Sequence, residues 1–81
     1  MTEELTEREK VVLEGLIRGE TNKMLAAKLF ISVSTVKAHV SSILHKLNVT
    51  NRVEAAVKGV YMLIEMEEND AKSKENLANK V

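Results

Sequence analysis

TNKMLAAKLFISVSTVKAHVSSILHKL, residues 21–47, contains two helical patterns separated by a short break. We expect the first helix to begin after an N-cap at Thr21 and to run to Phe30. Its apolar positions are Leu25, Ala26 and Leu29. Ile31 and Ser32 break this pattern, and the Ser32 hydroxyl can cap the second helix. The apolar positions of the second helix are Val36, Val40, Ile43, Leu44 and Leu47. Their spacing predicts a longer helix with one continuous face toward a core.

A further helix is predicted before this segment. Thr6 followed by Glu9 forms a capping box, in which each side chain accepts a hydrogen bond from the other residue's backbone N–H. The apolar side chains that follow share one face: Val12, Leu13, Leu16 and Ile17. We expect this helix to end at Gly19.

A fourth helix is predicted after the segment. Asn51 and Glu54 have the spacing of a second capping box, and the helical pattern continues to about Met66. We therefore assign residues 1–66 to one domain. Residues 67–81 are polar and mixed in charge, so we expect a frayed or weakly helical tail.

Composition supports a single small all-α domain. The chain has 81 residues, no proline, no cysteine and only three glycines, and a chain of this length holds one modest core. Without cysteine, no disulfide or thiolate zinc site can stabilise the fold, which suits a reducing cytoplasm. No apolar run is long enough to span a bilayer, and the acidic N-terminus does not resemble a signal peptide. We expect a cytoplasmic protein without a membrane partner.

Charge is distributed unevenly along the chain. The formal net charge is zero, whereas residues 21–58 hold six basic side chains and one acidic one. Residues 1–20 and 59–81 each have an acidic excess. A solvated helix face would explain such a run of charge, and a surface for a polyanion would explain it equally well.

The helix of residues 33–47 presents a polar face opposite its apolar stripe. Viewed down the axis, that face comprises Ser34, Ala38, Ser41, Ser42 and His45, with Lys37 on one edge and Thr35, His39 and Lys46 on the other. Two short helices joined by a tight turn are typical of helix-turn-helix domains, whose second helix enters the DNA major groove. Small side chains and hydrogen-bond donors suit such a face, and nothing acidic interrupts it.

Individual residues on this face can be assigned to bases or to the DNA backbone. Lys37 can donate to guanine, Ala38 can contact a thymine methyl group, and Ser41 can bond either a base or a phosphate. The flanking Thr35, His39 and Lys46 are placed for phosphates. Asn22 and Lys23 add donors at a helix N-terminus, where the helix dipole favours an anion.

The same residues resemble a known family. Leu5-Thr6-Glu7-Arg8-Glu9 is similar to its opening LTxRE, Gly19 with Asn22-Lys23 to its GxxNK segment, and residues 32–40 to its SxxTVKxHV signature. Further matching positions are Ala26, Leu29, Ile43, Lys46-Leu47, Asn51-Arg52 and Glu54-Ala55-Ala56. Through these matching positions, the sequence resembles the LuxR/FixJ/NarL family of bacterial transcription regulators over residues 5 to about 64.

This resemblance implies a four-helix domain of the LuxR/NarL C-terminal type. It places Lys37, Ala38 and Ser41 at base-reading positions. The implied backbone contacts are Asn22, Lys23, Ser34, Thr35, His39 and Lys46. Double-stranded DNA is then the expected ligand, with RNA polymerase as a further candidate partner. The chain would be a free-standing regulator or a fragment of a longer one. Gly15 stands where the family has a large apolar residue, which predicts a thinner core there.

Dimerisation is predicted from the fourth helix, which carries two apolar stripes. One comprises Val53, Ala56, Val57, Val60, Tyr61 and Ile64, and we expect it to pack on the core. The other comprises Ala55, Gly59, Met62 and Met66, and we expect it to contact the same helix of a second copy. Alternatively, the tail folds back over this second stripe, with Leu77 and Val81 against it.

Other functional classes have weaker support. A protein-interaction module that sequesters a partner regulator would explain the zero net charge, and sequence-blind binding to DNA is a third possibility. His39 and His45 lie about 240° apart on their helix, so they cannot bind one metal ion from the same face. No nucleophile, base and acid pattern or phosphate-binding loop is present, and we predict neither an enzyme nor a cofactor.

Overall fold

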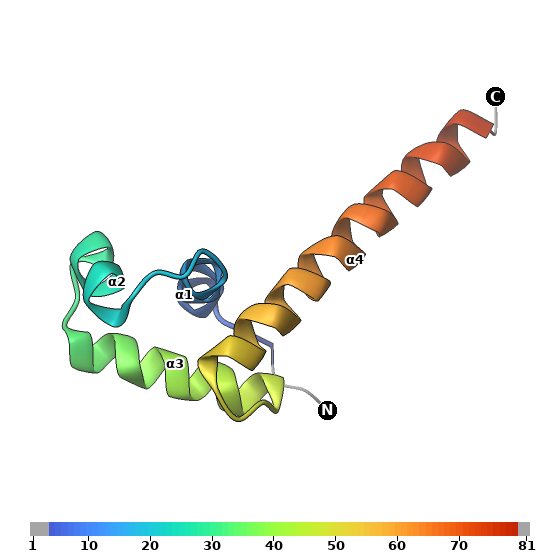
Figure 1. Cartoon of the computed structure of the whole chain (residues 1–81). Coiled ribbons are helices and arrows are strands. Elements are labelled where there is room, and N and C mark those ends of the chain that lie inside the picture. The colour runs from blue at the N-terminus through green and yellow to red at the C-terminus, as the bar shows by residue number, and fades with distance from the viewer. Residues whose placement is uncertain (1–3, 80–81) are drawn as a thin grey trace.

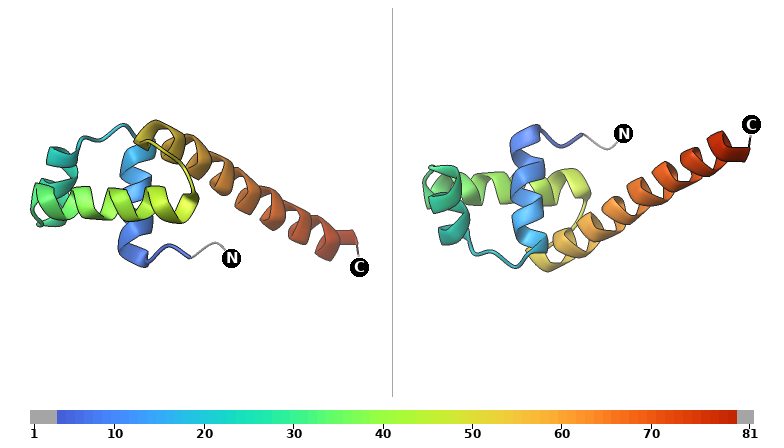
Figure 2. Two further views of the ribbon diagram at one scale, coloured as in Figure 1. Left: turned by 90° about the horizontal axis from the view of Figure 1, so that it is seen from below. Right: turned by 90° about the horizontal axis from the view of Figure 1, so that it is seen from above.

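Four helices make up the computed structural model, which describes the backbone of residues 4–79 and the side chains of residues 4–67. They are α1 (Glu7–Ile17), α2 (Asn22–Leu29), α3 (Val33–Leu47) and α4 (Arg52–Asn79). Figure 1 shows α2 above one end of α3, while α4 leaves from the other end and projects away from the other helices. Figure 2 shows α1 crossing α3 at a steep angle. Residues 4–79 contain no strand, and the predicted all-α fold of four helices is confirmed.

The predicted helix starts are present. The Thr6 hydroxyl accepts from the Glu9 N–H at 3.1 Å, and the Thr6 N–H donates to the Glu9 carboxylate at 2.8 Å. The other three caps accept from the N–H three residues later: Thr21 from Met24 at 3.1 Å, Ser32 from Thr35 at 3.0 Å and Asn51 from Glu54 at 2.9 Å. Each cap satisfies a backbone donor that the first turn of a helix leaves without a partner.

The core lies where α1, α2 and α4 pack around the inner side of α3. Its buried apolar side chains are Val12, Leu13, Leu16, Leu25, Ala26, Val36, Ile43, Leu47 and Ala55. α1 packs against both α3 and α4, and α2 packs against α3. Because Val36 and Ile43 are completely buried, the rotation of α3 about its axis is fixed and its opposite face is held toward solvent.

Gly15 does not thin the core, contrary to our expectation. A Cβ atom there would lie 2.4 Å from Cδ2 of Leu25, which is too close for two non-bonded carbon atoms. Leu25 is only 1% exposed, so its side chain fills the space that a larger residue would occupy. Glycine therefore leaves room on α1 for the Leu25 side chain, which comes from α2.

The inward face of α4 is the reverse of the predicted one. Ala55 is completely buried, and Gly59 is buried where its Cβ atom would lie 2.9 Å from Cδ1 of Ile17. Val57 of the other stripe is 51% exposed. Both stripes have helical spacing, but only the small residues let α4 approach α1 this closely. Ala55 and Gly59 therefore belong to the core, and their assignment to a dimer contact is wrong.

α4 also extends further than expected. Its backbone is helical to Asn79, past the end that we predicted near Met66. Residues 67–79 contain neither glycine nor proline and are rich in Ala, Lys and Glu, which favour helix. The side chains of Leu77 and Val81, invoked for a folded-back tail, lie outside the described residues.

Candidate DNA-contacting surface

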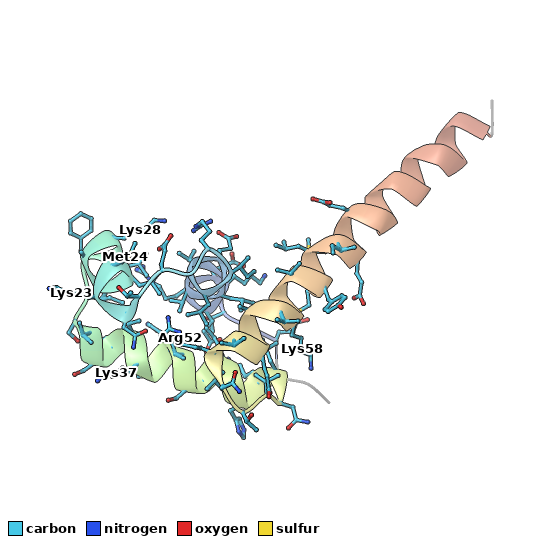
Figure 3. The ribbon with its side chains drawn as sticks, in the orientation of Figure 1. Lys23, Met24, Lys28, Lys37, Arg52 and Lys58 are labelled. Carbon is cyan, nitrogen blue, oxygen red and sulfur yellow. The ribbon has the colours of Figure 1, made fainter. Side chains whose placement is uncertain are left out.

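The outer face of α3 carries the three residues assigned to base reading. Lys37, Ala38 and Ser41 are exposed, as is Ser34 one turn before Lys37 and Ala38. In Figure 3, Lys37 lies on the side of α3 turned away from the other helices. His39 is half-buried at the edge of the face. The structure thus brings small side chains and one cation together on a face that a DNA groove can admit.

Thr35 takes part in the cap at the start of α3. Its hydroxyl lies 2.8 Å from the Ser32 hydroxyl, which also accepts from the Thr35 N–H. Thr35 is exposed, so its hydroxyl can still reach an outside partner. Its position is set by the cap.

The N-terminus of α2 is tied to the start of α4. Arg52 donates to the Asn22 side-chain oxygen at 2.8 Å and to the Glu20 carbonyl at 2.9 Å. The Asn22 amide nitrogen is not used in this pair. Lys23, the next residue, is exposed. Arg52 therefore holds α2 in place while Lys23 extends into solvent.

Lys46 does not extend toward a phosphate. Its ammonium group lies 2.8 Å from Oε1 of Glu9 and also donates to the Glu4 carbonyl at 3.3 Å. The Lys46 side chain is 15% exposed, and that of Glu9 is 5% exposed. Ser42, expected on the outer face, donates to the other Glu9 oxygen. The structure does not favour the predicted DNA contact of Lys46, because this ammonium group neutralises a buried carboxylate.

Glu9 is the centre of this network. Its carboxylate accepts from Lys46, from Ser42 and from the Thr6 N–H. These hydrogen bonds, that of Lys46 foremost, lower the pKa of Glu9 from an ordinary 4.5 to about 2, against the opposing effect of burial. The carboxylate therefore remains ionised in the folded protein at any ordinary pH.

Acid is expected to destabilise the fold through Glu9. Below pH 4.5 the unfolded chain takes up a proton on Glu9 that the folded chain still excludes. The stabilisation is complete above pH 4.5 and is lost as the pH falls toward 2, by roughly 3 kcal/mol. Glu20, whose pKa is lowered chiefly by a hydrogen bond from Arg18, acts in the same direction.

Urea unfolding at a series of pH values between 7 and 3 measures this loss. In a Glu9→Gln control the pH dependence should be much shallower, although that variant starts from a lower stability. An equal slope in both proteins would contradict the assignment to Glu9.

Sequence reasoning missed three polar contacts that position the surface. Glu9 was recognised only as a cap, and neither Arg52 nor Lys58 was given a structural role. Lys58 donates to the Leu47 carbonyl at 2.7 Å, where it satisfies an acceptor at the C-terminus of α3. These partners lie 11 to 37 residues apart, and no local pattern signals them.

A second exposed surface runs along α4. We define the α4 outer stripe as Val53, Val57, Val60 and Ile64, which are 68%, 51%, 40% and 44% exposed. Their spacing of four, three and four residues places them on one narrow face. Met62 and Met66 lie elsewhere, in a groove shared with Leu5, Leu13 and Ile17. The outer stripe is thus the apolar face of α4 that the core leaves uncovered.

Within the described residues, no three His, Cys, Asp or Glu side chains are grouped so that they could hold a metal ion. Over the same part of the chain, no helix combines the length and hydrophobicity needed to cross a membrane.

Comparisons with known proteins place this geometry in a family. The family model for bacterial regulatory proteins of the luxR family matches residues 3–58. The glycerol metabolism activator of Pseudomonas putida is 57% identical over 51 residues, which are 63% of this chain and 23% of that protein. The nitrate/nitrite response regulator protein NarL of Escherichia coli K12 is 48% identical over 54 residues, 67% of this chain and 25% of that protein.

A solved structure supports the same family as the family model and the two relatives. The response regulator ChrA of a heme-sensing two-component system has a TM-score of 0.70 and 43% identity, over 74% of this chain and 30% of that one. The chain spans about a quarter of the length of the curated relatives named here. With the family model covering more than two thirds of its residues, the chain belongs to the luxR family of bacterial regulatory proteins.

Proposed function

We propose that this chain binds double-stranded DNA sequence-specifically and thereby regulates transcription, with α3 in the major groove. The observation that carries the proposal is the outer face of α3, which exposes Lys37, Ala38 and Ser41. No acidic residue occurs between Thr21 and Val53, so nothing on α2 or α3 repels phosphate. Membership of the luxR family of regulators supports the same function.

The roles of the flanking residues follow from their partners. Lys23 is free of intramolecular hydrogen bonds among the described residues and exposed, so we assign it to a phosphate. Ser34 and His39 border the base-reading face, and we assign them to the backbone as well. Asn22 has its amide nitrogen and Thr35 its hydroxyl available for the same purpose. Lys46 is left out because its ammonium group is bound to Glu9.

We further propose that the chain acts as a homodimer through the α4 outer stripe. A narrow stripe of β-branched side chains spaced by four and three residues is typical of helices that pack against a twin helix. The stripe is apolar and uncovered in the described structure, and a second copy would remove it from water. Two copies would place two α3 helices in successive major grooves, about one helical turn apart. Met62 and Met66 are less suited to this contact because they face the groove beside α1.

Selection of bound sequences from a random duplex pool tests the proposal. The best site is then titrated at two salt concentrations beside random DNA of the same length. We expect two related half-sites and a clear preference over random DNA. Equal, strongly salt-dependent affinity for both duplexes would indicate sequence-blind binding. No binding at low salt would favour the module that sequesters a partner regulator.

Lys37 and Lys23 are expected to respond differently to truncation. Lys37→Ala should weaken binding to the selected site by about 1–3 kcal/mol and relax the base preference at one position. Lys23→Ala should weaken binding to all sequences alike and lower the salt slope by about one. Fluorescence-anisotropy titrations on selected and random duplexes measure both effects. If Lys37→Ala lost affinity equally on both duplexes, its base-reading role would be refuted.

A further inference from the structure

The guanidinium group of Arg52 connects two helices that are distant in the sequence. Its terminal nitrogens Nη1 and Nη2 donate to Oδ1 of Asn22 at 2.8 Å and to the Glu20 carbonyl at 2.9 Å. Arg52 and Asn22 are both half-buried, and in Figure 3 Arg52 lies between the start of α4 and α2. Because both arms of the planar group are bonded, its orientation beside the first residue of α2 is fixed.

This contact determines which end of the Asn22 amide faces outward. An asparagine amide has an oxygen that accepts and a nitrogen that donates, and a half-turn about its last bond exchanges the two. A guanidinium group can only donate, so it bonds the oxygen and leaves the nitrogen on the other side. Among the described residues, the one buried side-chain nitrogen or oxygen without a partner belongs to Glu20. The Asn22 amide nitrogen, which donates to no described group, is therefore open to solvent.

Other unused donors surround this amide nitrogen. Asn22 and Lys23 are the first two residues of α2, and the first turn of a helix leaves its backbone N–H groups without helical acceptors. The Thr21 hydroxyl accepts from the N–H of Met24, at 3.1 Å. Lys23 is exposed beside Asn22. An anionic oxygen is the partner that suits such a group of donors.

The Glu20 carboxylate does not disturb this arrangement. Its Oε1 atom accepts from Arg18 at 3.0 Å and from Lys28 at 3.3 Å, so two other cations compensate its charge. Arg52 bonds Glu20 through the backbone carbonyl. The guanidinium group is thereby left to hold the Asn22 amide.

We propose that Arg52 is a positioning residue that turns the Asn22 amide nitrogen toward a DNA phosphate. This inference rests on the proposed function, in which Asn22 contacts the DNA backbone. A flipped amide would present its oxygen to the phosphate, and two acceptors cannot form a hydrogen bond. Arg52 acts through Asn22 and makes no phosphate contact of its own. In this respect it differs from Lys23.

A double-mutant cycle on Asn22 and Arg52 tests the proposal, with anisotropy titrations on the selected duplex at several salt concentrations. Asn22→Ala and Arg52→Met should each weaken binding by about tenfold. The double variant should also lose about tenfold rather than 100-fold, because both changes remove the same contact. The salt slope should stay unchanged in all three, because no cation leaves a phosphate.

Two further variants exclude trivial causes. Asn22→Asp keeps an acceptor for Arg52 but replaces the outward donor by an acceptor, so it should retain its melting temperature and lose more affinity than Asn22→Ala. Lys10→Met removes one positive charge from α1, where Lys10 pairs with Glu7, and should bind as the wild type does. Circular dichroism at the titration temperature gives the folded fraction of each variant, and the affinities are corrected for it.

The possible results separate this inference from the proposed function. If the wild-type chain bound no duplex, the proposed function would fail and this inference with it. If it bound, a loss of about 100-fold in the double variant would overturn only the positioning role. Unchanged affinity in Arg52→Met or in Asn22→Asp would overturn it as well. A salt slope lowered by about one in Arg52→Met would instead assign Arg52 directly to a phosphate.

Discussion

Lys46→Ala is expected to lower the free energy of unfolding by about 3 to 5 kcal/mol, because it leaves the buried Glu9 carboxylate without its cation. The Glu9 side chain is 5% exposed, and its closest charged partner is the Lys46 ammonium group at 2.8 Å. A domain of this size has a total stability on the order of 4 to 12 kcal/mol. The variant should therefore be partly unfolded at moderate temperature. Urea titration followed by circular dichroism measures the change.

Lys10→Ala is the matched control. Lys10 forms an ion pair with Glu7 at 3.2 Å, but both side chains are more than half exposed, so its loss should cost at most about 0.5 kcal/mol. The double variant Glu9→Leu/Lys46→Met should recover most of the lost stability, since it removes both charges together. A loss below 1 kcal/mol for Lys46→Ala would mean that water already solvates the Glu9 carboxylate.

Val57→Lys is expected to convert the proposed dimer into monomers and to weaken binding to a two-half-site operator by about 100-fold or more. Val57 is half-exposed in the single chain, so lysine fits without disturbing the core. Two ammonium groups would then face each other in an apolar contact. A monomer occupies only one half-site at a time, so the avidity that comes from two linked copies is lost. The added positive charge would by itself strengthen binding to DNA. Repulsion between the variant and the phosphates therefore cannot explain a loss of DNA affinity.

Light scattering after size-exclusion chromatography measures the mass of each variant, and anisotropy titration measures its affinity. Glu65→Gln is the control, because it raises the net charge by the same amount on an exposed position of α4 outside the α4 outer stripe. It should remain dimeric and bind normally. If Val57→Lys remained dimeric, the dimer contact would lie elsewhere than on the α4 outer stripe. The groove lined by Met62 and Met66 would be the next candidate.

Much of the fold was predictable because its determinants are local. Thr6, Thr21 and Ser32 cap their helices through hydrogen bonds to residues three positions away. The apolar stripe of α3 likewise repeats within one helix. A sequence exposes such short-range patterns directly.

The remaining features depend on contacts between distant segments. Lys46 and Glu9 lie 37 positions apart. A helical wheel of α3 alone therefore shows Lys46 as a cation without a partner. The two stripes of α4 have the same period, and only the closeness of α1 at Gly59 selects the inward one. At Gly15 the sequence showed a missing side chain, whereas the space is filled by Leu25 from α2. In each case the deciding atom comes from another helix.

The hydrogen bonds of Arg52 bear on how such a protein would tell operators apart. They fasten the beginning of α4 to the beginning of α2, so the helix proposed to join two copies cannot swivel freely against the helices proposed to lie on DNA. One base pair inserted between half-sites rotates the second site about the duplex axis by about 34° and moves it by about 3.4 Å. A rigid joint cannot follow that rotation without breaking one set of contacts. Spacing, as much as base sequence, would then decide which promoters the protein occupies.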